Sequence, residues 1–227
     1  MKALVLFSGG IDSTTALALA INKYGKDRVI ALSVSYGQKH DKEIQAAIAV
    51  AEYYGVEHLF LDLRKIFTYS NCSLLKQSTE KIPEESYAKQ ISKTNGETPV
   101  STYVPFRNGL FLSSAASIAL SKDCEVIYYG AHADDSAGFA YPDCSPVFNR
   151  AMNEAIWEGS GHQLKIEAPF VNVSKAEVVR IGLELGVPYE LTWSCYEGGE
   201  KPCGKCGTCI DRAAAFQANH MEDPALR

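Results

Sequence analysis

The chain has 227 residues, of which 46% are hydrophobic and 22% are charged, and its net charge is −5. This length and composition are typical of one globular domain, alone or with a small appendage, that buries a sizeable core. The acidic balance argues against a general nucleic-acid binder, and the lack of a run of about 18 apolar residues argues against a membrane protein.

Two further features bear on the cellular compartment. The chain starts directly with a predicted strand and shows no secretion signal. It has seven cysteines, an odd number, and four of them lie in its last fifth. Clustered cysteines without a secretion signal favour metal binding over disulfides, so we expect a cytoplasmic protein.

The first apolar run, residues 3–7, predicts a buried parallel strand. The turn Ser8-Gly9-Gly10 breaks this strand, and a helix is predicted from about Asp12 to Asn22. Together they predict an anion site, because free backbone amides and the helix dipole meet at this point. An ordinary turn that is rich in glycine and serine is the alternative.

Residues 8–13, Ser-Gly-Gly-Ile-Asp-Ser, match neither Gly-x4-Gly-Lys-Ser/Thr nor Gly-x-Gly-x-x-Gly. They resemble the SGGxDS signature of the PP-loop ATP pyrophosphatases. This resemblance implies that ATP is cut between its α and β phosphates while the loop holds pyrophosphate. It implies catalytic roles for Ser8, Asp12 and Ser13. It also implies ATP contacts along the whole stretch, namely Phe7, Ser8, Gly9, Gly10, Ile11, Asp12, Ser13, Thr14, Thr15, Ala16 and Leu17.

Later elements continue the alternation of strands and helices. Four further apolar runs predict strands over residues 28–35, 57–63, 125–130 and 164–170. Helices are predicted over residues 41–54, 110–120, 146–158 and 174–186. This order predicts a Rossmann-like α/β fold in which helices flank a parallel five-stranded sheet. Residues 70–100 interrupt the pattern, and we predict a mobile lid over the site, with a disordered loop as the alternative.

Polar residues follow the predicted strands, and ligands of open α/β sheets bind at the carboxyl ends of strands. Tyr36, Gln38 and His40 come after the second strand and are candidates for contacts with a base or substrate. A polar start to the next helix explains them equally well. Arg107 and Asn108 precede a later helix and suit a phosphate or carboxylate, with capping and solvation as the alternative.

A polar group follows the fourth strand and consists of His132, Asp134, Asp135, Tyr141 and Asp143. Its acids suit Mg²⁺ or an amine-bearing heterocycle, or they are solvated turn and capping residues. His132 alone is more often a hydrogen-bonded structural residue than a catalyst. Lys175 opens the helix at residues 174–186, where a cation opposes the helix dipole, and this favours a bound polyphosphate.

The four C-terminal cysteines are the sharpest remaining pattern: Cys195, Cys203, Cys206 and Cys209. Four sulfurs at such short spacing suit a closed tetrahedral zinc site that contributes folding energy. An iron–sulfur cluster also takes four cysteines, and unrelated free thiols are the remaining alternative. We favour zinc because no redox partner motif is visible. Cys72, Cys124 and Cys144 remain outside this pattern.

Six motifs together resemble the 7-cyano-7-deazaguanine synthase family. They are FSGGIDSTTAL at 7–17, SYGQKH at 35–40, VPFRN at 104–108, YPDC at 141–144, KAEVVR at 175–180 and TWSCYEGGEKPCGKCGTC at 192–209. The resemblance implies an adenine nucleotide alpha hydrolase-like domain over residues 1–190. Residues 191–227 would form a small zinc-binding segment packed on it.

The activity implied is that of a carbon–nitrogen ligase. It converts 7-carboxy-7-deazaguanine, ammonia and ATP to 7-cyano-7-deazaguanine through an adenylated carboxylate and an adenylated amide. Arg107 and Lys175 would be cationic clamps, and Asp12 would be a possible partner of Mg²⁺. Tyr36, Gln38, His40, Asn108, His132, Asp135, Tyr141 and Asp143 are the candidate substrate contacts. The resemblance also implies a homodimer without a stable nucleic-acid partner.

Two other functions remain open at this point. A PP-loop tRNA thiolase also adenylates an oxygen, but it is expected to need a reactive cysteine pair and a basic RNA surface. A non-catalytic, nucleotide-sensing zinc module would bind ATP without releasing pyrophosphate.

Overall fold

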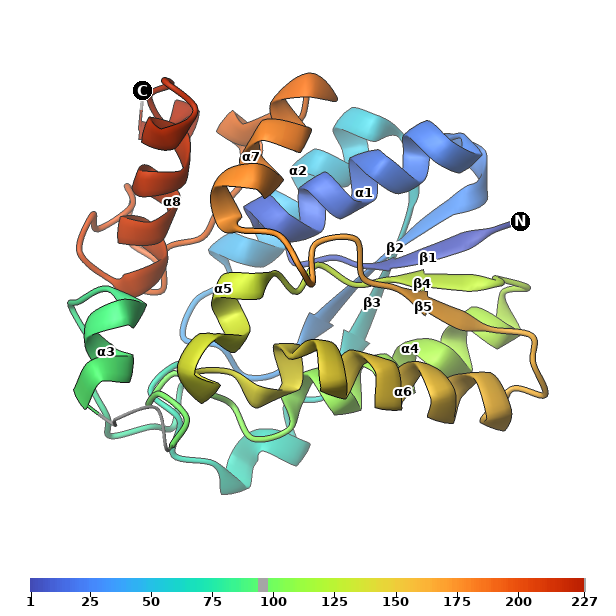
Figure 1. The fold of residues 1–227 in the computed structure, drawn as a ribbon, viewed down its shortest axis with the longest axis horizontal. Coiled ribbons are helices and arrows are strands. Elements are labelled where there is room, and N and C mark those ends of the chain that lie inside the picture. The colour runs from blue at the N-terminus through green and yellow to red at the C-terminus, as the bar shows by residue number, and fades with distance from the viewer. Residues whose placement is uncertain (94–97, 227) are drawn as a thin grey trace.

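A parallel sheet of five strands forms the centre of the protein (Figure 1), in a computed structural model that describes residues 1–93 and 98–226. The strand order is β3-β2-β1-β4-β5. Every neighbouring pair is parallel, which confirms the predicted sheet. The strands are β1 (Ala3–Leu6), β2 (Val29–Ser35), β3 (Glu57–Asp62), β4 (Val126–Tyr128) and β5 (Lys165–Glu167).

Helices cover both faces of this sheet (Figure 1). One face carries α1 (Ile11–Tyr24), α2 (Lys42–Tyr54) and α7 (Lys175–Glu184), and the other carries α4 (Arg107–Ser121) and α6 (Pro146–Gly159). In β1 all four residues are buried. Ala3 and Val5 join one core and Leu4 and Leu6 the other. A strand that is buried on both faces needs a continuous apolar run, which is why the sequence predicted β1 and β2 correctly.

The stretch after β3 is more structured than predicted. It contains α3 (Tyr87–Lys93), and a backbone bridge joins Leu75 to Gln38. Leu74 and Leu75 are buried in a third apolar cluster, together with three of the C-terminal cysteines. The expectation of an unstructured stretch is therefore wrong for these residues, because their apolar side chains pack without a regular period. Residues 94–97 of the predicted lid lie outside the described residues, and the mobility of the lid stays a prediction.

The C-terminal segment contains a further helix, α8 (Gly207–Ala218), that the sequence analysis did not predict. It lies beside α7 (Figure 1), and Asn219 at its end donates to the Ala176 carbonyl. The buried Arg212 of α8 forms an ion pair with Asp223 and also donates to Thr192. Helix α8 therefore fixes the last part of the chain to the α/β domain.

Short helices connect the main elements. They are α5 (Ala133–Ser136), η1 (Lys26–Arg28), η2 (Ile66–Tyr69), η3 (Ala137–Phe139), η4 (Pro142–Cys144), η5 (Tyr189–Leu191) and η6 (Pro224–Leu226). Among residues 1–93 and 98–226, no helix has both the length and the apolarity that crossing a membrane requires.

Candidate active site and metal centre

A cavity of about 630 Å³ lies at the carboxyl ends of β1, β2 and β4. Residues from the first turns of α1, α2, α4, α7 and α8 line it, so several helix N-termini meet around one space. Free amides and helix dipoles at such ends favour anions. The volume is that of an ordinary small-molecule site, and its position fits the rule for open parallel sheets.

The glycine loop forms one wall of this cavity. The Ser8 amide donates to Ser13 Oγ at 3.1 Å, and the two hydroxyl oxygens are also 3.1 Å apart. Gly9 has a φ of +81°, and a Cβ there would lie 2.5 Å from the backbone nitrogen of Ala47. Only glycine therefore lets α2 approach the loop this closely. The structure thus brings together Ser8 and Ser13, which the sequence predicted as catalytic residues.

The predicted ATP stretch divides into two groups. Six of its residues line the cavity: Phe7, Ser8, Gly10, Ile11, Asp12 and Ser13. The side chains of residues 14–17, in the first two turns of α1, are buried inside the protein. The Thr15 hydroxyl donates to the Ile11 carbonyl and also forms a hydrogen bond with the Tyr189 hydroxyl. Gly9 and residues 14–17 do not line the cavity and support the loop, and their contacts with ATP stay a prediction.

Lys175 lies against the start of α1. Its Nζ donates to Asp12 Oδ2, and its backbone amide donates to Asp134 Oδ2 at 2.8 Å. Burial raises the pKa of Asp12, but the charge of Lys175 and the neighbouring His132 outweigh this effect and hold the pKa below its ordinary value. Asp12 is therefore a carboxylate at neutral pH. The sequence analysis predicted a bound polyphosphate as the partner of Lys175, and in this structure its ammonium group pairs with Asp12 of the loop.

His132 contacts the same carboxylate. Its Nε2 lies 3.9 Å from Asp12 Oδ1 and 3.3 Å from Asp135 Oδ1. Among the described residues, neither His132 Nδ1 nor Asp12 Oδ1 has a hydrogen-bonding partner. Both side chains line the cavity, as does Asp135. The structure therefore places His132 and Asp135 of the predicted polar group beside the glycine loop, and the two unpartnered atoms belong to His132 and to Asp12 of the loop.

A second charged region includes Arg107 at the start of α4. Its guanidinium lies 5.2 Å from the centre of the Tyr36 ring and 5.9 Å from that of Phe111. Its Nη1 donates to the Tyr36 hydroxyl at 3.4 Å, while its Nε has no partner among the described residues. Burial raises the pKa of the nearby Glu43 to about 7, although the charge of Arg107 lowers it. All four side chains line the cavity.

Asp143 and His40 have structural roles. The Asp143 carboxylate accepts from the Asn108 backbone amide at 2.9 Å and so caps the start of α4. His40 packs against Trp193, with ring centres 6.3 Å apart, and accepts from the Lys42 amide. Neither residue lines the cavity, and their contacts with a substrate stay predictions. The turns that carry His40 and Asp143 follow β2 and β4, as the sequence predicted. The sequence does not show whether a side chain of such a turn faces the cavity or the neighbouring loop.

Other predicted substrate contacts do line the cavity: Tyr36, Gln38, Asn108, His132, Asp135 and Tyr141. Gln38 is partly committed, because its Oε1 accepts from the Tyr36 amide at 3.0 Å. Asn108 Nδ2 lies 3.2 Å from the sulfur of Cys144. Burial raises the pKa of Cys144 well above its ordinary value, so this residue is a neutral thiol at physiological pH and a weak nucleophile.

Several lining residues were missed by the sequence analysis: Glu43, Tyr87, Tyr129, Trp193, Tyr196 and Asp211. Trp193 belongs to a motif that had been noted, and its amide donates to the Gly9 carbonyl at 3.0 Å. Burial raises the pKa of Asp211 to about 6. Tyr196 belongs to the same motif, Tyr129 directly follows β4, and Glu43, Tyr87 and Asp211 stand within helices, where no local pattern of a single sequence distinguishes them from other helical residues.

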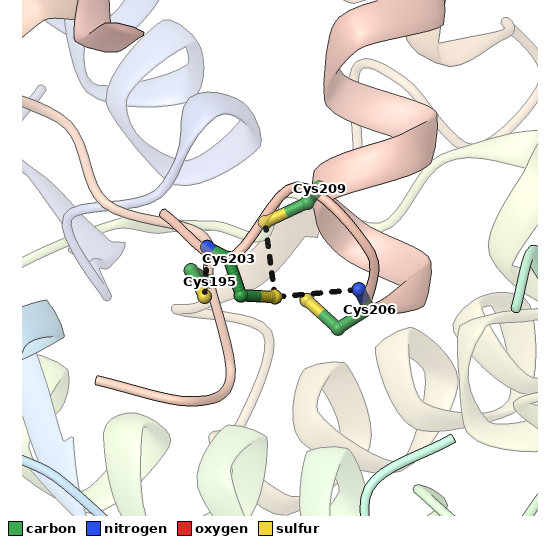
Figure 2. Close-up of side chains that lie close together, drawn as sticks. All are labelled: Cys195, Cys203, Cys206 and Cys209. Carbon is green, nitrogen blue, oxygen red and sulfur yellow. Dashed lines mark hydrogen bonds between the residues drawn. The ribbon is translucent and has the colours of Figure 1, made fainter. Parts of the chain in front are cut away.

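The four C-terminal cysteines meet at one point (Figure 2). The sulfurs of Cys195, Cys203, Cys206 and Cys209 all lie within 4.8 Å of one another. The backbone amides of Cys203 and Glu197 point at the Cys195 sulfur, at 3.3 and 3.4 Å, and the Cys206 amide points at the Cys203 sulfur. Such N–H groups stabilise thiolates, the form that binds a metal. The arrangement fits one tetrahedral ion, as the cysteine spacing predicted.

Comparisons with known proteins agree with this architecture. The family model described as "Queuosine biosynthesis protein QueC" matches residues 2–220. The chain is 42% identical to the 7-cyano-7-deazaguanine synthase of Archaeoglobus fulgidus over 227 residues, which are 100% of this chain and 90% of the relative. It is also 42% identical to the synthase of Caldicellulosiruptor saccharolyticus, over 99% of this chain and 94% of the relative.

A solved structure supports the fold alone. NMN synthetase from Francisella tularensis superimposes with a TM-score of 0.52 over 97% of this chain and 78% of that chain, at 15% sequence identity. The family assignment depends on the full-length sequence matches, and it agrees with the glycine loop and the four-cysteine centre described above. The chain belongs to the QueC family of queuosine biosynthesis proteins.

Proposed function

We propose that this protein is a 7-cyano-7-deazaguanine synthase, an ATP-dependent ligase that converts 7-carboxy-7-deazaguanine and ammonia to the nitrile. The observation that carries the proposal is the identity of about 40% to synthases of this name over the full chain. A cavity of suitable volume, with the SGGxDS loop on its wall, supports it.

The reaction needs two activations. A carboxylate oxygen of the substrate attacks the α-phosphorus of ATP and expels pyrophosphate, so that AMP becomes the leaving group. Ammonia then attacks the acyl carbon and displaces AMP, which gives the amide. A second ATP adenylates the amide oxygen, and loss of AMP and a proton leaves the nitrile. Because each step moves charge onto phosphate oxygens, catalysis depends on positioning and charge stabilisation.

We assign this work to residues of the cavity. The free amides of α1 and the hydroxyls of Ser8 and Ser13 would hold the departing pyrophosphate. Lys175 and Arg107 would stabilise negative charge on the phosphates or on the substrate carboxylate. His132, Asp135 and Tyr141 would contact the heterocycle.

Mg²⁺ fits this site through the chemistry of its donors. Asp12 is an ionised carboxylate whose Oδ1 has no partner among the described residues, and it faces the cavity beside the loop. Carboxylates together with substrate phosphates are the usual ligands of Mg²⁺. The ion would neutralise charge on the bound phosphates.

For the four-cysteine centre we propose structural zinc, held by a C-terminal segment of residues 191–227. Four cysteine ligands leave no open position for catalysis, and a closed site contributes folding energy. Free thiols at Cys72, Cys124 and Cys144 agree with a reducing compartment such as the cytoplasm. Elemental analysis should find one zinc per chain, and Cys206→Ser should lower this content. Iron with visible absorbance would instead indicate an iron–sulfur cluster.

The decisive experiment mixes the protein with 7-carboxy-7-deazaguanine, ammonium and MgATP, and follows AMP, pyrophosphate and product mass. We expect the nitrile with two AMP per turnover. ADP, or an unchanged acid, would refute the proposal. ATP binding without pyrophosphate release would favour the nucleotide-sensing module. AMP release that requires tRNA and a sulfur donor would favour the thiolase. Light scattering would test the expected homodimer.

A further inference from the structure

Helix α3 forms part of the cavity wall but is too short to be stable by itself. Tyr87, Ala88 and Ile91 of this helix line the cavity. The helix has seven residues, and isolated helices shorter than about 12 residues are marginal in water. Of these seven residues only Gln90 is fully buried. Contacts with other parts of the chain must therefore hold α3 in place.

Three of these contacts come from the four-cysteine segment, residues 195–209. The hydroxyls of Tyr87 and Tyr196 are 2.6 Å apart, and Tyr196 directly follows the cysteine at position 195. The Tyr87 ring packs on Gly207, where an added Cβ would lie 3.1 Å from it. Lys205 forms an ion pair with Glu84, just before α3. Figure 1 shows α3 beside the segment that leads into α8.

The tyrosine contact is partly buried, and it belongs to a larger group of hydroxyls. Thr102 and Tyr141 hydrogen-bond each other at 2.5 Å, and Tyr141 interacts with both Tyr87 and Tyr196. All three tyrosines line the cavity. A phenolic hydroxyl can both donate and accept a hydrogen bond, so these groups can satisfy one another. Removing one hydroxyl from such a group leaves its partner unsatisfied.

We propose that Tyr196 and Tyr87 form a latch through which the four-cysteine centre holds α3 against the cavity. In this role Tyr196 is a positioning residue, because the metal fixes the backbone at the neighbouring cysteine and the hydroxyl fixes α3. The metal would then shape the wall of the substrate cavity as well as stabilise the C-terminal segment. The proposal rests on the proposed function for its substrate and on zinc binding for its cause.

The main test is hydrogen exchange of residues 87–93 in the zinc-loaded protein. Tyr196→Phe and Tyr87→Phe should each speed exchange of α3 by up to about tenfold, as expected for the loss of one partly buried hydrogen bond. Tyr69→Phe is the matched control, because this side chain is 95% exposed, and it should change nothing. Glu84→Gln removes only the exposed ion pair and should have a smaller effect. Unchanged α3 exchange in both latch variants would overturn the proposal.

Two further measurements distinguish the loss of the Tyr196–Tyr87 latch from a general destabilisation of the fold. Zinc content of the latch variants should stay at one per chain. The KM for 7-carboxy-7-deazaguanine should rise about tenfold, whereas the free energy of unfolding in urea should fall by at most about 1.4 kcal/mol, the equivalent of a tenfold change in exchange. Faster α3 exchange with an unchanged KM would overturn the positioning role. Chelation of zinc from the unmodified protein should also speed α3 exchange, and the exchange readout stays informative if the proposed reaction fails.

Discussion

Replacing Lys175 with Met is expected to destabilise the fold by about 3 kcal/mol at pH 7. Lys175 and Asp12 form an ion pair, and their side chains are only 17% and 24% exposed. Two charges about 3 Å apart attract by roughly 5 kcal/mol at an effective dielectric constant of about 20. Breaking such a buried pair typically costs about 3–5 kcal/mol, and the partial exposure of Asp12 favours the lower end.

Urea unfolding, followed by tryptophan fluorescence, measures this effect. The matched control is Lys122→Met, because Lys122 pairs with Glu57 at the surface, where the side chains are 40% and 44% exposed. The control should lose at most about 1 kcal/mol. If Lys175→Met loses no more than Lys122→Met, the buried pair does not stabilise the fold and the reasoning fails.

The pH dependence gives a second check on the same pair. The pKa of Asp12 lies below its ordinary value in the folded protein, so its stabilising contribution is present above pH 3.8 and is lost as the pH falls through the lowered pKa. In the Lys175→Met variant the unpaired carboxylate should instead have a raised pKa. The stability difference between the two proteins should therefore start to shrink as the pH falls through this raised pKa, and it should continue to shrink below pH 3.8. Adding Asp12→Asn to Lys175→Met should restore part of the stability at pH 7.

Three other changes have defined outcomes. Glu43→Gln should become more stable to unfolding than the unmodified protein as the pH rises from 5 to 8, by about 2–3 kcal/mol in total. The reason is that the pKa of Glu43 is raised to about 7 in the folded protein, so ionisation of its carboxyl group destabilises the fold over this range. Urea titrations at several pH values test this, and a constant difference would contradict it. Gly9→Ala should weaken ATP binding and lower stability by more than about 2 kcal/mol, whereas Gly25→Ala, with a similar φ but open space, should lose about 1 kcal/mol. In Arg212→Met the free energy of unfolding in urea should fall by about 3–5 kcal/mol, because Asp223 is then buried without its ion-pair partner. A fall of less than about 1 kcal/mol would show that the ion pair does not stabilise the fold.

The sequence predicted the sheet well because its signal is local. Strands buried on both faces require continuous apolar runs, as at residues 29–35, and glycine is the residue expected where α2 ends. The N-caps Ser145 and Ser174 are local in the same sense, since each accepts from an amide three residues ahead. Features that depend on neighbours within about four residues could be predicted from one sequence.

The parts that could not be predicted depend on distant partners. Helix α3 has only seven residues, and its hydroxyl partner Tyr196 lies 109 residues away from Tyr87. Asp143 and His40 stand at the carboxyl ends of strands, as binding residues do, yet one caps α4 and the other packs on Trp193. Whether a polar side chain at this edge faces the cavity or the loop beneath it depends on tertiary packing, which leaves no local pattern.

Lys175 shows how far a physical argument from sequence can reach. A lysine in the first turn of a helix opposes the helix dipole, so the sequence alone indicated that an anion must lie nearby. In the structure two carboxylates of the chain meet this need, since Asp12 accepts from the side chain and Asp134 from the backbone amide. Bound phosphates would compete with Asp12 for the same ammonium group. The pair keeps the lysine beside the glycine loop, so under the proposed function the free-energy cost of ordering its side chain when ATP binds would be lower.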